Sequence, residues 1–226
     1  GGVDTLSFST YPAATFNLAQ LTFAATNQAY SVVGTSLDDT FKWTGTGVSG
    51  SAQALNLNGG AGTDTLSLIG DPETHYRLAN INMTNVEFIA GSTGNDWVSW
   101  NGSGAFSFDL AGGTDTLDLT SKSTTGGMNI SLTDAKYSNI EVVYGTSMAD
   151  RLSGAAANET LNGGIGADWI WGGAGDDALI GGKGADTYWF GFGDGKDTIS
   201  ADAGNSASDI VKFEGGSGTA AWSQLT

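Results

Sequence analysis

The chain has 226 residues, and 24 acidic against 8 basic side chains give it a formal net charge of −16. So acidic a balance argues against nucleic acid or an anionic membrane as an electrostatic partner and favours cations. The chain has no cysteine, which excludes disulfides and thiolate metal sites, and no apolar run approaches the roughly 18 residues that suggest a membrane-spanning helix.

Glycine accounts for 36 residues and proline for only 2, so the glycine content is not that of a proline-rich linker. The glycines fall at repeated turn positions, and the chain is long enough to bury a core. Its first residues, GGVDTLSFST, contain neither an initiating Met nor a signal-peptide pattern. We therefore expect the chain to be a fragment of a larger protein.

Residues 1–144 repeat at a long period. Three stretches open alike, at 1–8, 59–68 and 112–119, and three others share a second signature, at 30–41, 86–98 and 140–152. Each places an acidic residue in or beside a glycine turn: Asp4, Asp64 and Asp115 in the first set, and Asp39, Asp96 and Asp150 in the second. The spacing predicts three units of about 55 residues, of which the third runs into the block described below.

Short alternating segments in this region predict β-strands, and no segment of ten or more residues has a helical period. The predicted strands are 5–8, 15–18, 54–57, 65–68, 106–110, 116–119 and 128–132. We interpret 1–144 as a degenerate long-repeat β-solenoid, in which each unit buries its apolar row against the next. A β-sandwich is the alternative, and the constant spacing favours the solenoid.

From Gly145 to Trp189 one nine-residue pattern runs five times without a break, and its best copies are GGIGADWIW, GGAGDDALI and GGKGADTYW. The sixth position is always acidic: Asp150, Glu159, Asp168, Asp177 and Asp186. The eighth is always large and apolar: Leu152, Leu161, Ile170, Leu179 and Tyr188. Glycines allow a tight turn whose carbonyls face one side, and the last three positions form a strand with its middle residue inward.

Two nonapeptides then complete one flattened coil, so that turns two repeats apart stack roughly 4.8 Å from each other. Stacked carboxylates would repel. Calcium, a hard cation with about 6–8 oxygen ligands, removes the repulsion by binding between two turns. Metal binding and folding then become one event.

The pattern G-G-x-G-x-D-x-U-x resembles the repeat of the RTX, or hemolysin-type, calcium-binding proteins. The resemblance implies an all-β fold, a parallel β-roll at 145–226 that follows the longer coils of 1–144, and several Ca²⁺ ions. It also implies which groups bind each ion. The earlier turn of a stacked pair supplies the backbone carbonyls of its second and fourth residues and its acidic side chain. The later turn supplies the backbone carbonyls of its first and third residues and its own acidic side chain.

The implied ligands between the turns at 163 and 181 are Gly164, Gly166, Asp168, Gly181, Lys183 and Asp186. Between the turns at 145 and 163 they are Thr146, Met148, Asp150, Gly163, Ile165 and Asp168. Between the turns at 154 and 172 they are Ala155, Ala157, Glu159, Gly172, Ala174 and Asp177, where Glu and alanines depart from the family pattern. A two-residue insertion in the segment 190–199 gives a fourth set, in which Asp197 stacks on Asp177 with Gly173 and Gly175.

The upstream segment GGAGTDTLS (59–67) also matches the nonapeptide, but no copy stands two repeats to either side of it. Asp96 and Asp115, separated by nearly two repeats, form the closest upstream pair. A single glycine-rich match is more often only a turn, so the sequence favours metal-free turns in 1–144. Contiguous copies of the repeat distinguish a calcium-binding block from a metal-free glycine turn.

Seven tryptophans are many for this length. Strand alternation places Trp43 and Trp100 inside the core, whereas Trp169, Trp171 and Trp189 occupy outward positions of the nonapeptide. The outward indoles could bind a sugar ring, dock on another domain or form an oligomer contact. Alternatively, they only cover the sheet or pack under the tail 200–226.

Catalysis finds little support. The single histidine, His75, lies in the loop-like segment 70–78, and no G-x-S-x-G motif is present. We therefore expect no enzyme activity. The resemblance implies export by type I secretion and folding outside the cell, where calcium is plentiful.

We expect an extracellular calcium-binding structural module of a secreted surface-layer or adhesin-like protein. Self-assembly or a cell-surface glycan would be its partner, with no nucleic acid and no membrane insertion. The alternatives are the non-catalytic C-terminal domain of a secreted enzyme or toxin, and a glycan-binding module.

Overall fold

The computed structural model describes residues 4–8, 10–18, 30–45, 55–70, 75–78, 81–102, 104–122, 126–200 and 208–214. These residues form short β-strands joined by turns, and the chain divides into two compact units, Gly1–Asp115 and Thr116–Thr226. Within the described ranges no helix has the length and apolarity needed to cross a membrane.

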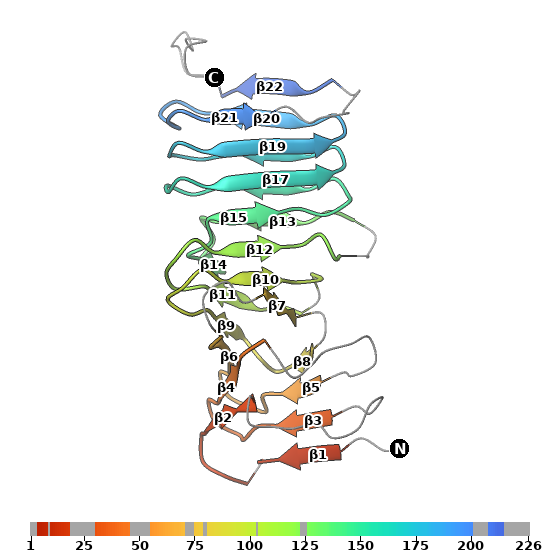
Figure 1. Ribbon diagram of the computed structural model, residues 1–226, viewed down its shortest axis with the longest axis vertical. Helices are drawn as coiled ribbons and strands as arrows, with labels where there is room; N and C mark the ends of the chain where they lie inside the picture. Colours follow the sequence, from red (N-terminus) through yellow and green to blue (C-terminus); the bar gives the residue numbers. More distant parts are fainter. Residues whose placement is uncertain are drawn as a thin grey trace. The chain divides into compact units, whose positions relative to one another are not determined.

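The first unit is built from parallel sheets (Figure 1). One sheet has the order β1 (Asp4–Ser7), β3 (Tyr30–Val33), β5 (Leu55–Asn58) and β8 (Ile81–Thr84). A second has the order β2 (Thr15–Asn17), β4 (Thr40–Trp43), β6 (Thr65–Leu68), β9 (Phe88–Ala90) and β11 (Ser107–Asp109). Strand β7 (His75–Arg77) pairs with β10 (Trp97–Ser99), again in parallel.

Each of these coils of the first unit contains more residues than the 18 of two nonapeptides. Tyr30 lies opposite Leu55 and Thr40 opposite Thr65, so one coil takes 25 residues on both sheets. Near the end of the unit the coil shortens, because Phe88 lies opposite Ser107 and Asp96 bonds to Asp115, each at an offset of 19 residues.

The second unit has two facing rows of parallel strands. One row has the order β12 (Thr116–Asp118), β15 (Val142–Tyr144), β17 (Thr160–Ile165), β19 (Ala178–Lys183) and β21 (Thr198–Ser200). The other has the order β13 (Asn129–Ser131), β16 (Arg151–Ser153), β18 (Trp169–Trp171), β20 (Thr187–Phe190) and β22 (Ile210–Phe213), and β14 (Tyr137–Ser138) is a two-residue strand.

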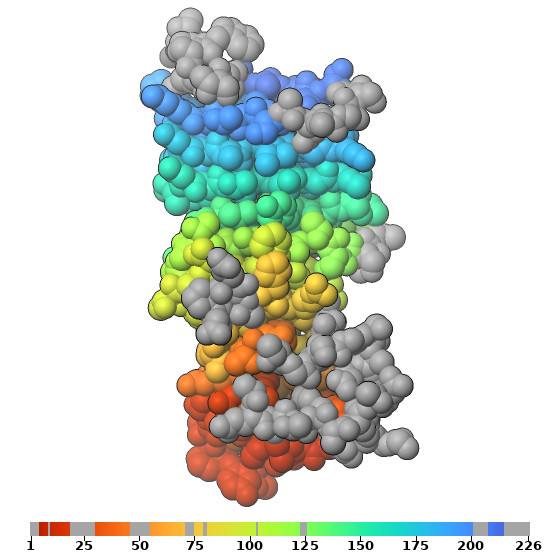
Figure 2. All heavy atoms as spheres, in the orientation of Figure 1, coloured from red at the N-terminus to blue at the C-terminus, as the bar shows by residue number. Residues whose placement is uncertain are grey.

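In the nonapeptide block the coil is 18 residues long on both rows, since Thr160 lies opposite Ala178 and Trp169 opposite Thr187. In Figure 2 successive coils of this unit form successive bands, whose colour changes steadily from green to blue. Apolar side chains of the eighth position fill the space between the two rows. Leu152, Leu161, Ile170, Leu179 and Tyr188 are each at most 1% exposed.

The predicted fold class is confirmed: the protein is an all-β solenoid of parallel coils. A sandwich of antiparallel sheets is excluded for the described strands, because their pairs run parallel. Each predicted upstream strand overlaps an observed one, although Ala54 lies outside the described residues. Trp43 and Trp100 are buried as predicted. The loop predicted at 70–78 is wrong at residues 75–77, which form β7.

Truncation of one inward side chain tests this core. Leu161→Ala removes a fully buried side chain between two neighbouring coils, and we expect it to lower the free energy of unfolding by about 2–5 kcal/mol. Chemical denaturation in saturating calcium measures the change. Asn162→Ala, at the half-buried neighbour on the same strand, is the control and should change the free energy far less.

Candidate metal centre

Among the described residues, ten acidic side chains are buried at the turns of this solenoid, five of them at the sixth position of the nonapeptides. Asp150, Glu159, Asp168, Asp177 and Asp186 are each at most 3% exposed. Carboxylates are seldom buried unless they are paired, hydrogen-bonded or bound to a metal. Their partners therefore define what the turns can bind.

On one edge of the second unit the carboxylates form a ladder. The backbone N–H of Asp150 donates to Oδ1 of Asp168 at 2.7 Å, and that of Asp168 donates to Oδ1 of Asp186 at 2.8 Å. Asp186 in turn donates to Oδ1 of Asp209 at 3.0 Å. Each acidic side chain therefore ties its own turn to the turn one coil earlier.

The opposite edge repeats the arrangement. Glu159 donates its N–H to Oδ1 of Asp177 at 2.8 Å, and Asp177 donates to Oδ1 of Asp197 at 3.1 Å. Ala178 lies opposite Thr198, so the coil is 20 residues long at this step. The two inserted residues therefore place Asp197 over Asp177, as the sequence predicts.

The second carboxylate oxygen is left without a protein donor at two of these positions. Oδ2 of Asp168 and Oδ2 of Asp177 are buried and accept no hydrogen bond from the described residues. Burial raises the pKa of Asp168 to about 7, and the charges of Asp150 and Asp186 add to the effect. Burial likewise raises the pKa of Asp177 to about 6, with Glu159 adding to it.

These oxygens fit a hard cation. A buried carboxylate oxygen without a donor costs free energy, and a cation bound beside it would remove that cost and return the pKa toward its ordinary range. Calcium prefers carboxylate and carbonyl oxygens, which are the groups that the turns present. When bound, the ion would supply charge neutralisation and cross-linking of neighbouring coils.

Backbones of stacked turns lie in direct contact, which brings their carbonyls close to the next turn. A Cβ added to Gly166, whose φ is 151°, would lie 2.5 Å from the carbonyl oxygen of Met148. A Cβ on Gly145 would lie 2.3 Å from the carbonyl oxygen of Gly163 and 2.7 Å from Oδ2 of Asp150. Glycine is required here because a side chain would fill the space where oxygens of two turns converge.

The structure stacks all four pairs of turns that the resemblance implies. Several of the implied carbonyl ligands also accept hydrogen bonds: Thr146 from Ile165 at 3.1 Å, Ala155 from Ala174 at 2.9 Å, Lys183 from Gly166 at 2.7 Å, and Met148 from the hydroxyl of Thr146 at 3.5 Å. A carbonyl oxygen has two lone pairs, so each keeps one for a ligand. Of the implied fourth set, Gly175 donates to the carbonyl of Asp194 in the stacked turn at 2.7 Å. Gly173 packs against the earlier turn, where a Cβ added to it would lie 2.4 Å from the carbonyl oxygen of Ala155.

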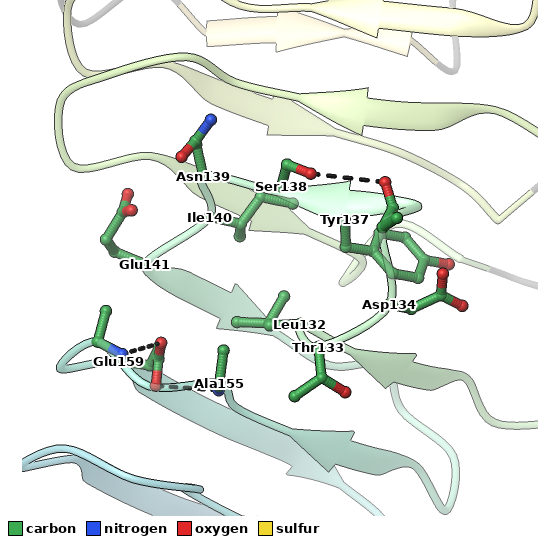
Figure 3. A pocket seen from close by; sticks show the side chains of 12 residues that line it. Leu132, Thr133, Asp134, Tyr137, Ser138, Asn139, Ile140, Glu141, Ala155 and Glu159 are labelled. Atoms are coloured by element: carbon green, nitrogen blue, oxygen red, sulfur yellow. Dashed lines mark hydrogen bonds between the residues drawn. The ribbon is translucent and has the colours of Figure 1, made fainter.

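The turn at 154 differs from the others because its acid is Glu159. Its longer side chain folds back onto its own turn, where Oε2 accepts from the N–H of Ala155 at 3.3 Å and Oε1 from that of Ala157 at 3.2 Å. Figure 3 shows both bonds beside a pocket of about 300 Å³, with Glu141 directly before strand β15. Burial raises the pKa of Glu159, and Glu141 adds to the effect.

Sequence reasoning missed Asp209, which continues the first ladder. It stands 23 residues after Asp186, outside the period of the nonapeptide block, and the only local signal is the apolar strand that follows it. The described residues contain no group of three or more carboxylate, His or Cys side chains that could hold a metal. A cation in these turns therefore needs backbone carbonyls as well as carboxylates.

Fold and turns together define a parallel β-roll whose stacked turns present carboxylate and carbonyl oxygens that suit a cation. A comparison with protein families identifies the block: residues 153–188 and 193–206 match the RTX calcium-binding nonapeptide repeat in four copies. This part of the chain is an RTX calcium-binding β-roll module. No match to the chain was found among curated proteins. An RTX β-solenoid is a structural domain and is generally non-catalytic.

His75, the single histidine, is exposed and stacks on Trp97, with ring centroids 4.8 Å apart and planes 9° from parallel. The half-buried Trp171 and Trp189 lie opposite each other on β18 and β20. The tail 201–207 and 215–226, under which they could pack, lies outside the described residues.

The raised pKa values predict a pH dependence that reverses with calcium. In chelator, folding favours the protonated forms of Asp168 and Asp177, so stability is greatest below the ordinary pKa of 3.8 and falls as the pH rises to about 7. In saturating calcium only the charged forms bind the ion, so stability should rise over the same interval. Melting curves between pH 4.5 and about 8, with and without calcium, measure both slopes; equal slopes would contradict the assignment.

Proposed function

We propose that the chain is a calcium-dependent structural module, in which Ca²⁺ ions bind between stacked turns and hold the coils together. The observation that carries this proposal is the pair of buried Oδ2 atoms of Asp168 and Asp177, which no donor among the described residues satisfies. The match to the RTX calcium-binding repeat supports the choice of ion. The formal charge of −16 supports a cation as the stabilising partner.

The proposed ligands are the carboxylates at the sixth positions and the carbonyls of the stacked turns, as the family resemblance assigns them. Between the turns at 163 and 181, Asp168 supplies the unsatisfied oxygen. Between the turn at 172 and Asp197, Asp177 supplies it. Glu159 and alanines replace the Asp and glycines of the family pattern, so we expect the pair at 154 and 172 to bind calcium more weakly.

We infer that the protein is secreted and acts at the cell surface as part of a surface-layer or adhesin-like protein. RTX repeats occur in proteins exported by type I secretion, which supports an extracellular location. The repeated solenoid coils and the composition, rich in glycine and poor in lysine, support a structural or adhesive role. A non-catalytic RTX domain of a secreted enzyme or toxin is the alternative, and a hydrolase motif upstream of Gly1 in the full gene would favour it.

Removal of calcium tests the proposal directly. In excess chelator we expect loss of the β-sheet circular dichroism signal and of the cooperative melting transition at neutral pH, because the charged carboxylates of the stacked turns repel one another. Millimolar calcium should restore both. An identical spectrum and melting temperature in chelator and in calcium would contradict calcium-dependent folding.

A neighbouring pair of aspartates provides a matched test of one site. Asp177→Asn removes the charge but keeps an oxygen that can accept the N–H of Glu159. Asp176→Asn removes an exposed charge one residue away, where the carboxylate accepts the N–H of Lys196 at 2.9 Å. We expect D177N to bind fewer calcium ions by calorimetry and D176N to bind as many as the wild type.

A glycan-binding role is a second candidate, which a specific surface feature favours. Trp169, Trp171 and Trp189 line a pocket of about 120 Å³ together with Phe190, Gly191 and Glu214. The rings of Trp169 and Trp189 lie 5.4 Å apart, and Arg151 lies 4.3 Å over the ring of Trp169. Nε1 of Trp189 is buried and has no acceptor among the described residues. Apolar ring faces beside polar groups suit a sugar ring.

Retention on a polysaccharide column distinguishes the glycan-binding role from the structural role in a surface layer. If the glycan role is correct, the double variant Trp171→Ala/Trp189→Ala should lose retention by about tenfold or more, since stacking area is lost. Trp97→Ala is the control, because this half-buried indole lies outside the pocket. Ordered two-dimensional assembly on addition of calcium, without retention, would instead favour the surface-layer role.

A further inference from the structure

Two turns of the first unit stack on each other outside the residues that match the RTX family. Turn 34–39 joins β3 to β4, and turn 59–64 joins β5 to β6. Val33 lies opposite Asn58 and Thr40 opposite Thr65, so the turns are in register on both sides. Their offset is 25 residues, whereas the turns at 145 and 163 are 18 residues apart.

The carboxylates of these turns form the same bond as in the RTX block. The N–H of Asp39 donates to Oδ1 of Asp64 at 2.7 Å. The N–H of Asp150 donates to Oδ1 of Asp168 at the same distance. Asp39 and Asp64 are at most 1% exposed, so the upstream ladder is as deeply buried as the one in the block.

The first turn of each pair is also capped in the same way. The N–H of Thr35 donates to Oδ2 of Asp39 at 2.6 Å, and its hydroxyl donates to Oδ1 at 3.1 Å. Thr146 makes the same two bonds to Asp150, at 2.6 and 3.0 Å. The upstream turn therefore has the geometry of the turn at 145 atom by atom.

The backbone contacts between the turns 34–39 and 59–64 also match those between the turns at 145 and 163. Gly60 has a φ of 113°, and a Cβ added to it would lie 1.8 Å from the carbonyl oxygen of Thr35. A Cβ on Gly34 would lie 2.0 Å from the carbonyl oxygen of Gly59 and 2.6 Å from Oδ2 of Asp39. Carbonyl and carboxylate oxygens from two turns thus converge where Gly34 has only hydrogen, as they do at Gly145.

The later turn carries an oxygen that the described protein groups do not satisfy. Asp64 is 0% exposed, and its Oδ2 accepts no hydrogen bond from the described residues. This oxygen would lie 2.4 Å from a Cβ on Gly59, the distance that separates Oδ2 of Asp168 from a Cβ on Gly163. The orphaned oxygen therefore occupies the same place in the upstream turn as in the RTX turn.

We propose that the turns 34–39 and 59–64 form a further calcium site, with the carboxylates of Asp39 and Asp64 and the carbonyls of both turns as its ligands. The inference rests on the proposed calcium sites of the RTX block, whose geometry these turns repeat. The longer coil does not disturb the site, because its additional residues fall in sequence between β4 and β5 and not within either turn. The proposal departs from the metal-free turn that the sequence favours at 59–67.

A count of bound calcium in the full chain tests the upstream site. Asp64→Asn keeps an oxygen that can accept the N–H of Asp39, but it replaces the orphaned oxygen with an amide and removes the charge. Asp38→Asn is the matched control, since this exposed carboxylate lies on the stacked turn 34–39 and accepts the N–H of Thr63 at 2.7 Å. We expect equilibrium dialysis to find one calcium ion fewer per chain in D64N than in the wild type, and no change in D38N.

The D177N variant separates this inference from the proposed function. If D177N loses calcium and D64N binds as many ions as the wild type, the upstream site is wrong and the RTX sites stand. A wild-type chain that binds no calcium would overturn both.

Hydrogen exchange of the wild type provides a test that needs no variant. We expect calcium to slow amide exchange in peptides that cover 34–39 and 59–64 as well as in those that cover 145–186. Calcium-dependent protection confined to the RTX block would overturn the upstream site.

Discussion

The interaction on which the rest of the structure depends is the bond between an acidic side chain and the backbone N–H of the acidic residue one coil earlier. It fixes the register of neighbouring coils, because it joins equivalent positions such as Asp168 and Asp186. It also brings carboxylates of the same sign close together in a buried turn. The same contact that aligns the coils therefore makes them repel, and a cation resolves the conflict.

Calcium and the apolar core stabilise the solenoid in different ways. Inward side chains such as Leu161 and Leu179 gain free energy by burial whatever the ionic conditions. The turns gain free energy only when the charges of their carboxylates are neutralised. A chain of this kind can remain unfolded where calcium is scarce and fold where it is abundant, which suits a protein that folds after export.

The parallel between the turns at 34 and 145 shows that the geometry of the turns does not depend on coil length. A pair of turns needs register on both flanking strands, glycine at the points of backbone contact and a carboxylate directed at the turn. The wider coils of the first unit and the narrower coils of the nonapeptide block meet these requirements equally, because the extra residues of the wider coil fall between β4 and β5. Turns of this geometry can therefore occur in solenoid coils that a search at the nonapeptide period does not detect.

The sequence by itself determined the inward residues and the stacking within the nonapeptide block, because both follow from a strict local period, and its resemblance to the RTX repeat implied the parallel roll. The position of Asp197 over Asp177 could also be predicted, since one short insertion separates the two turns. Only the tertiary structure decided that Asp64 stacks on Asp39 and Asp209 on Asp186, because those coils are 25 and 23 residues long and no period marks them. The tertiary structure alone decided which carboxylate oxygens are satisfied, because that depends on contacts between stacked coils, such as the bond from the N–H of Asp150 to Oδ1 of Asp168.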